Sequence, residues 1–279
     1  DLHFGRPCRI WLRRNRDRMM LAIFEEAALA AGRVILDIYQ RGFEVESKAD
    51  QSPVTEADVR AEEVILSHLK AHMPDVPVIA EEQMAAGIEP DISGGRFLLI
   101  DPLDGTREFI NRNGEFTVNI ALIEDGRPVA GIVYAPAVGV AYTGGPDGAC
   151  KLDVDQTQNV LSRRPIHVRP VAASPIAVAS RSYLDAETSR YLDELKPCEC
   201  RTVGSSLKFG LVAEGLADVY PRFGRTMEWD TAAGDAVVRA AGGSVLAADG
   251  QPLTYGKRGR QDVADFANGV FFAWGGRDA

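Results

Sequence analysis

The segment Phe97-Leu-Leu-Ile-Asp-Pro-Leu-Asp-Gly-Thr106 joins an apolar run to two aspartates, Asp101 and Asp104. A short apolar run that is bounded by a turn signal predicts a buried strand. Pro102 fixes its own φ and holds Asp101 in an extended conformation, so the chain turns sharply where the strand ends. The two carboxylates can therefore face the same point.

The same turn offers further groups to a ligand. The carbonyl oxygen of Leu103 can face the carboxylates, and hard cations accept backbone oxygens alongside carboxylates. Gly105 and Thr106 open the next helix, whose N–H groups can receive phosphate oxygens. Asp101 and Asp104 equally suit a structural turn in which they accept backbone N–H groups. Taken alone, the segment leaves a structural turn and a metal site equally open.

Three other segments also place acids at the ends of predicted elements. Val78-Ile-Ala-Glu-Glu82 is an apolar strand that delivers acids at its end, with Glu81 as the better ligand candidate. Thr55-Glu-Ala-Asp58 has the spacing of a capping box, which by itself explains Asp58 as a helix cap. Glu228-Trp-Asp-Thr-Ala-Ala-Gly234 places Asp230 at the start of an alanine-rich helix, where Asp is a good N-cap. Each segment has a structural explanation of its own, so the site prediction depends on all of them together.

The first half of the chain predicts helices that back an antiparallel sheet. Apolar residues recur at helical spacing in two stretches, and alternate in strands joined by the turn signal Asp125-Gly126. The expected elements are helices at 21–39 and 55–72 and strands at 97–100, 116–123 and 129–134.

The second half alternates strands and helices, which indicates a mixed or parallel sheet with helical crossovers. After a weakly patterned stretch from 144 to 165, the expected elements are strands at 176–179, 217–220 and 244–246 and helices at 183–195, 206–214 and 230–241. We expect residues 1–19 to be a basic extension, 20–160 an N-terminal α+β lobe with most metal ligands, and 161–279 a C-terminal α/β lobe with Asp230. A cleft between two lobes is a usual place for a small-molecule site.

Composition limits the possible functions. The chain has 279 residues, of which 46% are hydrophobic and 25% are charged, an ordinary balance for a globular protein. Its formal net charge of -9 argues against a partner that is a nucleic-acid polymer, because such binders usually carry a basic face. An anionic small molecule stays compatible, since divalent cations turn an acidic pocket into an anion-binding one.

The four cysteines make neither a disulfide framework nor a C-x-x-C zinc motif, which favours a reducing, cytoplasmic setting. Cys198-Glu-Cys200 is interpreted as two small half-buried residues at a strand edge rather than as a redox pair. The sequence contains no apolar run long enough to cross a membrane.

The start of the chain is unusual in composition. Six arginines lie between Arg6 and Arg18, ahead of Met19 and Met20. We expect residues 1–19 to be disordered, on composition. The alternative is a basic anchor that makes a peripheral contact with anionic lipid at the inner face of the cell membrane.

Taken together and in this order, these segments resemble the inositol monophosphatase superfamily of lithium-sensitive magnesium phosphatases, and within it the bacterial 3'(2'),5'-bisphosphate nucleotidases. The resemblance covers roughly Met20 to Gly243. It is carried by Ser47-Lys-Ala-Asp-Gln-Ser-Pro-Val-Thr-Glu-Ala-Asp58, Asp101-Pro-Leu-Asp-Gly-Thr-Arg-Glu-Phe-Ile110, Gly114-Glu-Phe-Thr-Val-Asn-Ile-Ala-Leu-Ile123, Gly204-Ser-Ser-Leu-Lys-Phe209 with Val212-Ala-Glu-Gly215, and Trp229-Asp-Thr-Ala-Ala-Gly234. It implies a sugar-phosphatase fold of alternating helix and sheet layers, with an antiparallel N-terminal sheet, a mixed or parallel C-terminal sheet, and a site between the lobes.

The resemblance also implies residue roles. Two or three Mg²⁺ ions would be held by Glu81, Asp101, the carbonyl of Leu103, Asp104 and Asp230. Asp58 and Thr106, together with Glu81, would activate and orient the attacking water, so Asp58 can be more than a cap. A metal pair can activate a water and stabilise the leaving oxygen, and no cysteine or histidine nucleophile is needed. The four histidines lie outside these motifs.

Substrate contacts are implied around the metals and in the second lobe. The first group is Glu81, Leu103, Asp104, Gly105, Thr106 and Asp230, and the second is Ser205, Ser206, Lys208 and Arg222. Gly204-Ser-Ser-Leu-Lys208 suits a ribose or a second phosphate, while a solvated helix face is the alternative for Lys208. Arg222 or Arg225 stands in a stretch where inositol phosphatases carry a carboxylate that receives ring hydroxyls. Arg107 stands where similar nucleotidases usually carry Lys.

The leading hypothesis is hydrolysis of adenosine 3',5'-bisphosphate to AMP and phosphate, an activity that in the family supports sulfate assimilation. An inositol-1-monophosphatase or related sugar phosphatase is the alternative within the family. A catalytically silent nucleotide sensor on the same fold is the alternative from another class. The sequence does not determine the oligomeric state.

Overall fold

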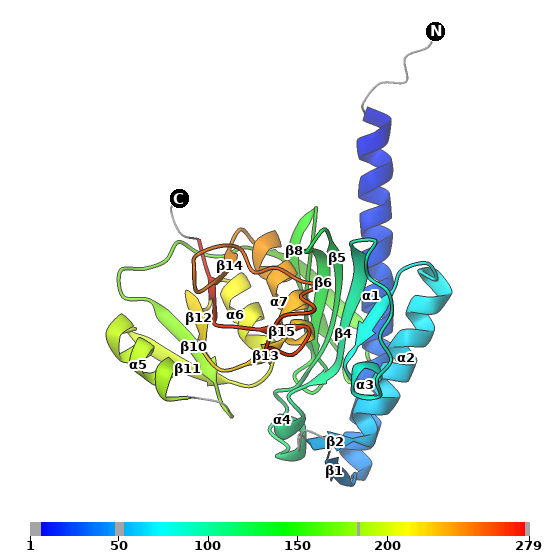
Figure 1. Ribbon diagram of the computed structural model, residues 1–279, viewed down its shortest axis with the longest axis horizontal. Coiled ribbons are helices and arrows are strands. Elements are labelled where there is room, and N and C mark those ends of the chain that lie inside the picture. The colour runs from blue at the N-terminus through cyan, green and yellow to red at the C-terminus, as the bar shows by residue number, and fades with distance from the viewer. Residues whose placement is uncertain (1–6, 48–52, 183–184, 277–279) are drawn as a thin grey trace.

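The protein, described here by a computed structural model over residues 7–47, 53–182 and 185–276, stacks helices and sheets in alternating layers (Figure 1). A helix pair covers one face of a large sheet, a second helix pair lies between this sheet and a smaller one, and a last helix covers the smaller sheet. The layered α/β fold expected from the sequence is therefore confirmed.

The outer helix pair consists of α1 (Pro7–Arg41) and α2 (Glu56–His72), joined through the hairpin of β1 (Val45–Ser47) and β2 (Pro53–Thr55). Apolar residues at helical spacing on both helices, among them Phe24, Ile35 and Ile65, are fully buried against the sheet. Burial of one such side chain contributes roughly 1.5–3 kcal/mol. This amphipathic pattern fixes which face of each helix meets the sheet.

The large sheet has seven strands that neighbour one another in sequence order. β3 is parallel to β4, and the other neighbouring pairs are antiparallel. The strands are β3 (Val78–Ala80), β4 (Arg96–Asp104), β5 (Thr117–Glu124), β6 (Arg127–Ala135), β7 (Val140–Gly145), β8 (Gly148–Val154) and β9 (Val160–Ile166). The short helices α3 (Glu81–Ala85) and α4 (Thr106–Ile110) follow β3 and β4, so both acidic strand ends belong to this sheet.

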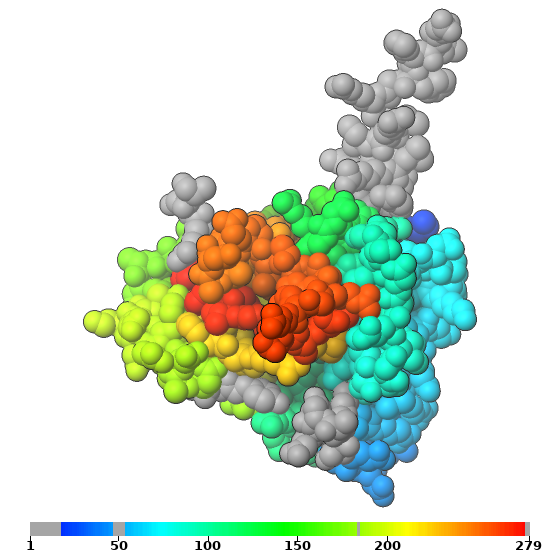
Figure 2. Space-filling view, in the orientation of Figure 1, coloured from blue at the N-terminus to red at the C-terminus, as the bar shows by residue number. Residues whose placement is uncertain are grey.

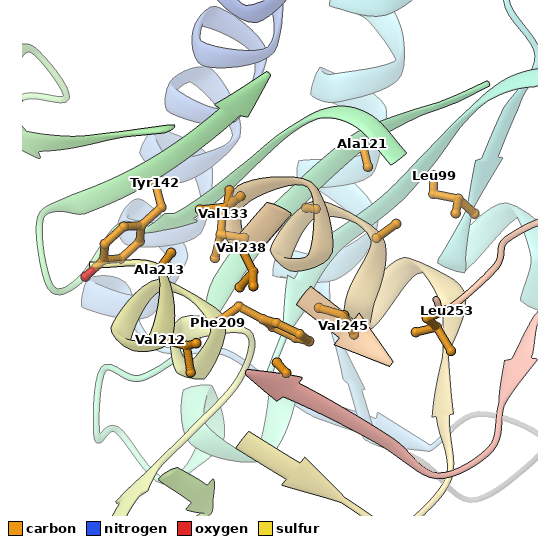
Figure 3. Packing of buried hydrophobic residues seen from close by; sticks show 14 of the residues in the cluster. Leu99, Ala121, Val133, Tyr142, Phe209, Val212, Ala213, Val238, Val245 and Leu253 are labelled. Atoms are coloured by element: carbon orange, nitrogen blue, oxygen red, sulfur yellow. The ribbon is translucent and has the colours of Figure 1, made fainter. Parts of the chain in front are cut away.

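The middle layer consists of α6 (Leu207–Ala213) and α7 (Glu228–Ala240), which lie between the two sheets. Figure 3 shows part of the shared core, where Phe209 of α6 lies among apolar residues of α7 and of both sheets. α7 packs so closely on the large sheet that no side chain fits at Gly144 of β7. A Cβ at this position would be only 2.5 Å from the Cα of Val237. The two predicted lobes therefore share one core.

The smaller sheet has five strands in the order β11-β10-β12-β16-β14. β10 is parallel to β11 and β12, whereas β16 is antiparallel to β12 and β14, so the sheet is mixed, as expected. Its strands are β10 (Ile176–Ser180), β11 (Glu199–Val203), β12 (Val219–Arg222), β14 (Ser244–Ala247) and β16 (Phe271–Trp274). α5 (Ala186–Leu195) covers the outer face, and β13 (Thr226–Met227) pairs separately with β15 (Ala267–Asn268).

Residues 7–19, which the sequence analysis expects to be part of a disordered extension, lie in α1. Arginine and leucine favour helix, and extending a helix that is already nucleated and packed costs little. The start of α1 projects beyond the layers (Figure 1). Residues 1–6 lie outside the described residues. None of the described helices is long and apolar enough to span a bilayer.

Some expected boundaries also differ. The weakly patterned stretch 144–165 contains β8 and most of β9, so the large sheet continues beyond residue 160 and the second sheet starts at Ile176. β4 continues to Asp104 through a register shift rather than ending at Ile100. α7 starts at Glu228, two residues before Asp230. Cys198 and Cys200 are exposed rather than half-buried.

Candidate active site

A cavity of about 760 Å³ lies where the turn after β4, α3, the start of α6, the end of β12 and the start of α7 meet. It brings together segments that are far apart in the sequence. The predicted site residues that line it are Glu81, Asp101, Leu103, Asp104, Gly105, Thr106, Ser205, Ser206, Lys208, Arg222 and Asp230. Asp58 is not among the lining residues.

Local backbone geometry holds the irregular end of β4, which carries Asp101 and Asp104, and the turn that follows it. Asp101 is buried, and its Oδ1 accepts the N–H of Leu103 at 3.0 Å, as the structural-turn interpretation predicts. Gly105 has a φ of 92°, a left-handed conformation that favours glycine. A Cβ at Gly105 would lie 3.2 Å from the Cβ of Ser205 and 3.3 Å from the Glu115 carbonyl oxygen. Glycine therefore suits this position in two ways, through its left-handed φ and through the close approach to Ser205.

Asp58 combines the two roles that were considered for it. Its Oδ2 accepts the N–H and the hydroxyl of Thr55 at 2.8 Å each, which completes the capping box of α2. Its Oδ1 accepts the hydroxyl of Thr106 at 3.2 Å. Asp58 therefore reaches the cavity through Thr106.

Glu81 and Asp230 reach the cavity from two different helices. Glu81 is the first residue of α3, and Asp230 is the third residue of α7, with its Oδ2 accepting the N–H of Met227 at 2.8 Å. Asp230 is therefore not the N-cap residue that the sequence suggested. Acids in a first helical turn commonly fold back onto the cap N–H, because this satisfies an orphan donor.

Glu81, Asp101, Asp104 and Asp230 form what we call the acidic wall of the cavity. Burial raises the pKa of Asp230 well above its usual range, and the charges of Asp104 and Glu81 raise it further. Carboxylates that repel one another in this way favour a bound cation. The described residues that line the cavity include no cysteine or histidine, so the available donors are the oxygens that Mg²⁺ prefers.

The acidic wall is not preassembled as a ligand cage. Within the described part of the chain, no three acidic, histidine or cysteine side chains are gathered closely enough to hold a metal ion. Asp101 is bonded to the Leu103 N–H and Asp104 to a serine hydroxyl. The donor set fits Mg²⁺ in chemistry, and its side chains would turn toward an ion on binding it.

The hydroxyl of Ser206 links the acidic wall to the second half of the chain. Its Oγ lies 2.5 Å from Asp104 Oδ2 and 2.7 Å from the carbonyl oxygen of Asp230. Asn119 Nδ2 donates to Ser206 Oγ at 3.0 Å. Ser206, which the sequence analysis expects to contact substrate, lines the cavity and also orients Asp104. Asn119 was missed, although an amide in the apolar strand β5 was a usable signal.

Lys208, Arg222 and Arg225 form what we call the basic wall. Lys208 is only 4% exposed, so the solvated helix face considered for it is wrong. Its Nζ donates to the carbonyl oxygens of Val203, at 3.3 Å, and Ser205. Burial lowers the pKa of Lys208 to about 8, although the charge of Asp104 acts in the opposite direction.

The other cations of the cavity differ in exposure. Arg222 is 8% exposed at the end of β12, and its Nε donates to the Gly224 carbonyl at 3.1 Å. Arg225 and Arg107 are exposed and line the cavity. Arg107 thus lies close to the acidic wall, where its charge can reach an anionic ligand.

The Gly204–Ser206 turn is held from the large-sheet side by Glu115, which sequence reasoning missed. Glu115 Oε2 accepts the N–H of Gly204 at 2.7 Å, and the carboxylate forms two hydrogen bonds with Arg181 at 2.7 and 2.8 Å. Ser205 has a φ of 49°, a conformation that costs a residue other than glycine free energy. Glu115 and Lys208 bond to the backbone on either side of this strained residue.

At the rim of the cavity, a surface ion pair joins the two halves of the chain. Arg258 Nη2 donates to Glu89 Oε2 at 2.7 Å, and Glu89 lines the cavity. In Figure 2 this C-terminal loop, in orange, lies against the segment after α3, in blue-green. The cavity is therefore bordered by both halves of the chain.

These observations define the class of protein, which is a layered α/β protein with an acidic site between its sheets. The chain belongs to the inositol monophosphatase family, whose model matches residues 16–265. This confirms the family resemblance found in the sequence.

Individual relatives agree with this assignment. The chain is 48% identical over 235 residues to 3'(2'),5'-bisphosphate nucleotidase CysQ of Escherichia coli strain K12, covering 84% of this chain and 92% of that protein. It is 41% identical over 258 residues to CysQ of Buchnera aphidicola, covering 92% and 94%.

Solved structures share the fold. CysQ from Bacteroides thetaiotaomicron superposes with a TM-score of 0.76 at 39% identity, covering 92% of this chain and 97% of that one. The Thermotoga maritima inositol monophosphatase gives a TM-score of 0.71 at 25% identity, covering 92% and 91%. Both the nucleotidase and the inositol phosphatase branches are thus represented among similar structures.

Proposed function

We propose that this chain is a magnesium-dependent 3'(2'),5'-bisphosphate nucleotidase that hydrolyses adenosine 3',5'-bisphosphate to AMP and phosphate. The observation that carries the proposal is the presence of an acidic wall and a basic wall in one cavity. A substrate with two separate phosphates can use both walls, one phosphate through metal ions and the other through arginine and lysine. The similarity to CysQ relatives, which are 3'(2'),5'-bisphosphate nucleotidases, supports the same conclusion.

The acidic wall would hold two or three Mg²⁺ ions through Glu81, Asp101, the Leu103 carbonyl, Asp104 and Asp230. When bound, the ions supply positive charge that neutralises the phosphate and lowers the pKa of the attacking water. Mg²⁺ also keeps several waters of its own, so a site with few protein oxygens is sufficient.

Thr106 and Asp58 would orient the attacking water. Because the Thr106 hydroxyl donates to Asp58, its lone pairs remain available to accept a hydrogen bond from that water. This hydrogen bond would aim a lone pair of the water at phosphorus. As the water bonds to phosphorus it gives up one proton, the ester P–O bond breaks, and the departing ribose oxygen takes up one proton, so that AMP and inorganic phosphate are formed.

The basic wall would receive the second phosphate. Arg222 presents a guanidinium that suits phosphate geometry, and Lys208 adds charge beneath the Gly204–Ser206 turn. An inositol monophosphate has no second phosphate for these cations. The proposal therefore favours a bisphosphate nucleotide over an inositol phosphate.

The deciding experiment measures kcat/KM for adenosine 3',5'-bisphosphate and for inositol 1-phosphate, before and after chelation and with Mg²⁺ restored. We expect at least about a tenfold preference for the nucleotide, because one charge-assisted hydrogen bond contributes roughly 1.5–3 kcal/mol. Preference for inositol 1-phosphate would assign the other branch of the family. Tight nucleotide binding without phosphate release would indicate a sensor.

A further inference from the structure

Glu62 is a buried carboxylate that takes no direct part in the proposed chemistry. It lies in the middle of α2, is only 4% exposed, and is absent from the residues that line the cavity. Burying a carboxylate is costly unless its oxygens are hydrogen-bonded. Its two oxygens accept the backbone N–H groups of Glu82 at 2.7 Å and Gln83 at 2.9 Å.

These two N–H groups belong to the first turn of α3. The first turn of a helix leaves N–H groups without partners, and a polar N-cap side chain usually accepts one of them. The N-cap of α3 is Ala80, which makes no side-chain cap bond. Glu62 therefore caps α3 from another helix, with one oxygen for each of two successive peptides.

We propose that Glu62 is a positioning residue for Glu81, the member of the acidic wall that directly precedes these two peptides. Glu81 has less support from packing than the other acids. Asp101 and Asp104 belong to β4 inside a seven-stranded sheet, and Asp230 belongs to the largely buried α7. In contrast, none of the five residues of α3, all of them described, is buried. α3 packs on the core through the partly buried Met84, and the two Glu62 bonds hold its first turn, which carries Glu81.

This inference rests on the proposed metal-dependent function, and it predicts a specific pattern of effects. Loss of the Glu62 bonds would let α3 rotate and move Glu81 away from the other carboxylates. Metal binding would weaken, while the basic wall, on α6, at the end of β12 and in the segment after β12, would keep its geometry. Residues that orient ligands in this way typically change metal affinity 10- to 100-fold, by order of magnitude.

The chain offers a matched control. Glu63 is the next residue on α2, is exposed, and carries the same charge. Burial raises the pKa of Glu62 to about 7, so the comparison is made above that pH, where Glu62→Gln and Glu63→Gln remove the same unit of charge. Only the first replaces an oxygen acceptor by an NH₂ group facing a backbone N–H. Glu62→Asp keeps the charge and is one methylene too short to reach both peptides.

The test compares these variants in two measurements on the whole protein. Mn²⁺ binding to the protein without substrate is measured by calorimetry, and hydrogen–deuterium exchange is measured at residues 81–85. We expect both Glu62 variants to bind Mn²⁺ about tenfold more weakly and to exchange faster in α3, with the Glu63 variant unchanged. At saturating Mg²⁺ the KM for the nucleotide should stay within about twofold of wild type.

The proposal is overturned if Glu62→Asp binds Mn²⁺ as tightly as the wild-type protein, or if its exchange in α3 is unchanged. This variant keeps the test valid even if Glu62→Gln does not fold. A Glu63 variant with the same loss would overturn it too, because charge alone would then be responsible. If the wild-type protein binds no divalent ion, the proposed function fails. Exchange in α3 then still decides whether Glu62 holds this helix.

Discussion

The acidic wall and the basic wall of the cavity are built in different ways. Each acidic residue lies at the end of a strand or in a first helical turn, and its motif is contiguous in the sequence. The basic residues lie on a short helix, at a strand end and in the segment after it, and the side chains of Lys208 and Arg222 bond to nearby backbone carbonyls. A distant contact is that of Glu115 with Gly204, in the turn before Lys208. The acidic motifs indicate the chemistry, while the shape of the basic wall depends in part on this contact between the two halves of the chain.

The pKa values of buried residues in the two walls are also shifted in opposite directions. Burial and neighbouring carboxylates raise the pKa of Asp230, whereas burial lowers the pKa of Lys208 to about 8. Both shifts disfavour the charged form. A metal ion at one wall and an anionic group at the other would stabilise both charged forms.

Removing a charge from the acidic wall should have the largest effect. We expect Asp104→Asn to lower kcat/KM for the nucleotide by about 10³-fold or more, because charge stabilisation by metal amounts to several kcal/mol. Steady-state kinetics across a Mg²⁺ titration would check this. Asp75→Asn, a change at an exposed loop residue, is the matched control. Full turnover by Asp104→Asn would exclude the metal mechanism.

The water-orienting pair should come next. Thr106→Ala is expected to lower kcat by about 10²-fold, in the range for a positioned proton-transfer group, with KM little changed. Thr106→Ser keeps the hydroxyl that donates to Asp58 and should retain activity within a few-fold. Equal losses in both variants would show that the methyl group, and not the hydroxyl, matters.

A change in the basic wall should alter substrate choice and leave the chemistry intact. We expect Arg222→Met to raise KM for adenosine 3',5'-bisphosphate about tenfold, the effect of losing one charge-assisted hydrogen bond. Activity on inositol 1-phosphate should stay within about twofold, since that substrate has no second phosphate. Arg190→Met, on the exposed side of α5, is the control. A parallel loss on both substrates would contradict the assignment of Arg222.

The same local-versus-distant contrast explains what the sequence could predict. The strand, turn and helix around Asp101 to Thr106 and the helices before them could be predicted, because the spacing of apolar residues and the turn residues specify them locally. The acidic residues of the cavity were predicted from the same segments. β7 to β9 were harder to predict, because they are short strands interrupted by Gly, Pro and Asp. β16 pairs between β12 and β14 through contacts that no local pattern specifies.

Several site roles depend on such long-range contacts. Asn119 meets Ser206 across 87 positions of sequence, and Glu115 meets Gly204 across 89. Glu62 meets α3 across 20. Spacing rules relate residues within one helix or strand, so they could not connect these pairs. Lys208 was uncertain for the same reason, because its burial depends on how the two sheets enclose α6.

The Glu115 contact gives the smallest expected effect. Burial raises the pKa of Glu115, but the Arg181 hydrogen bond and the Gly204 N–H outweigh it and hold the pKa below its usual range. A lowered carboxylate pKa means that the contact is fully formed above the unfolded-state pKa and is lost as pH falls through the folded-state value. It should therefore be intact throughout roughly pH 6 to 8.

Glu115→Gln keeps an oxygen for the Gly204 N–H but loses the ion pair with Arg181, in which the arginine is partly exposed. We expect a loss of about two- to fivefold in kcat/KM for the nucleotide, in line with an exposed ion pair of roughly 0.2–1 kcal/mol. The wild-type to variant ratio should stay constant from about pH 6 to 8. Glu124→Gln removes a comparable ion pair to Arg96 elsewhere on the large sheet and should leave kcat/KM unchanged. An effect of Glu115→Gln on Mg²⁺ dependence would mean that the Gly204–Ser206 turn also shapes the acidic wall, through the bond of Ser206 to Asp104.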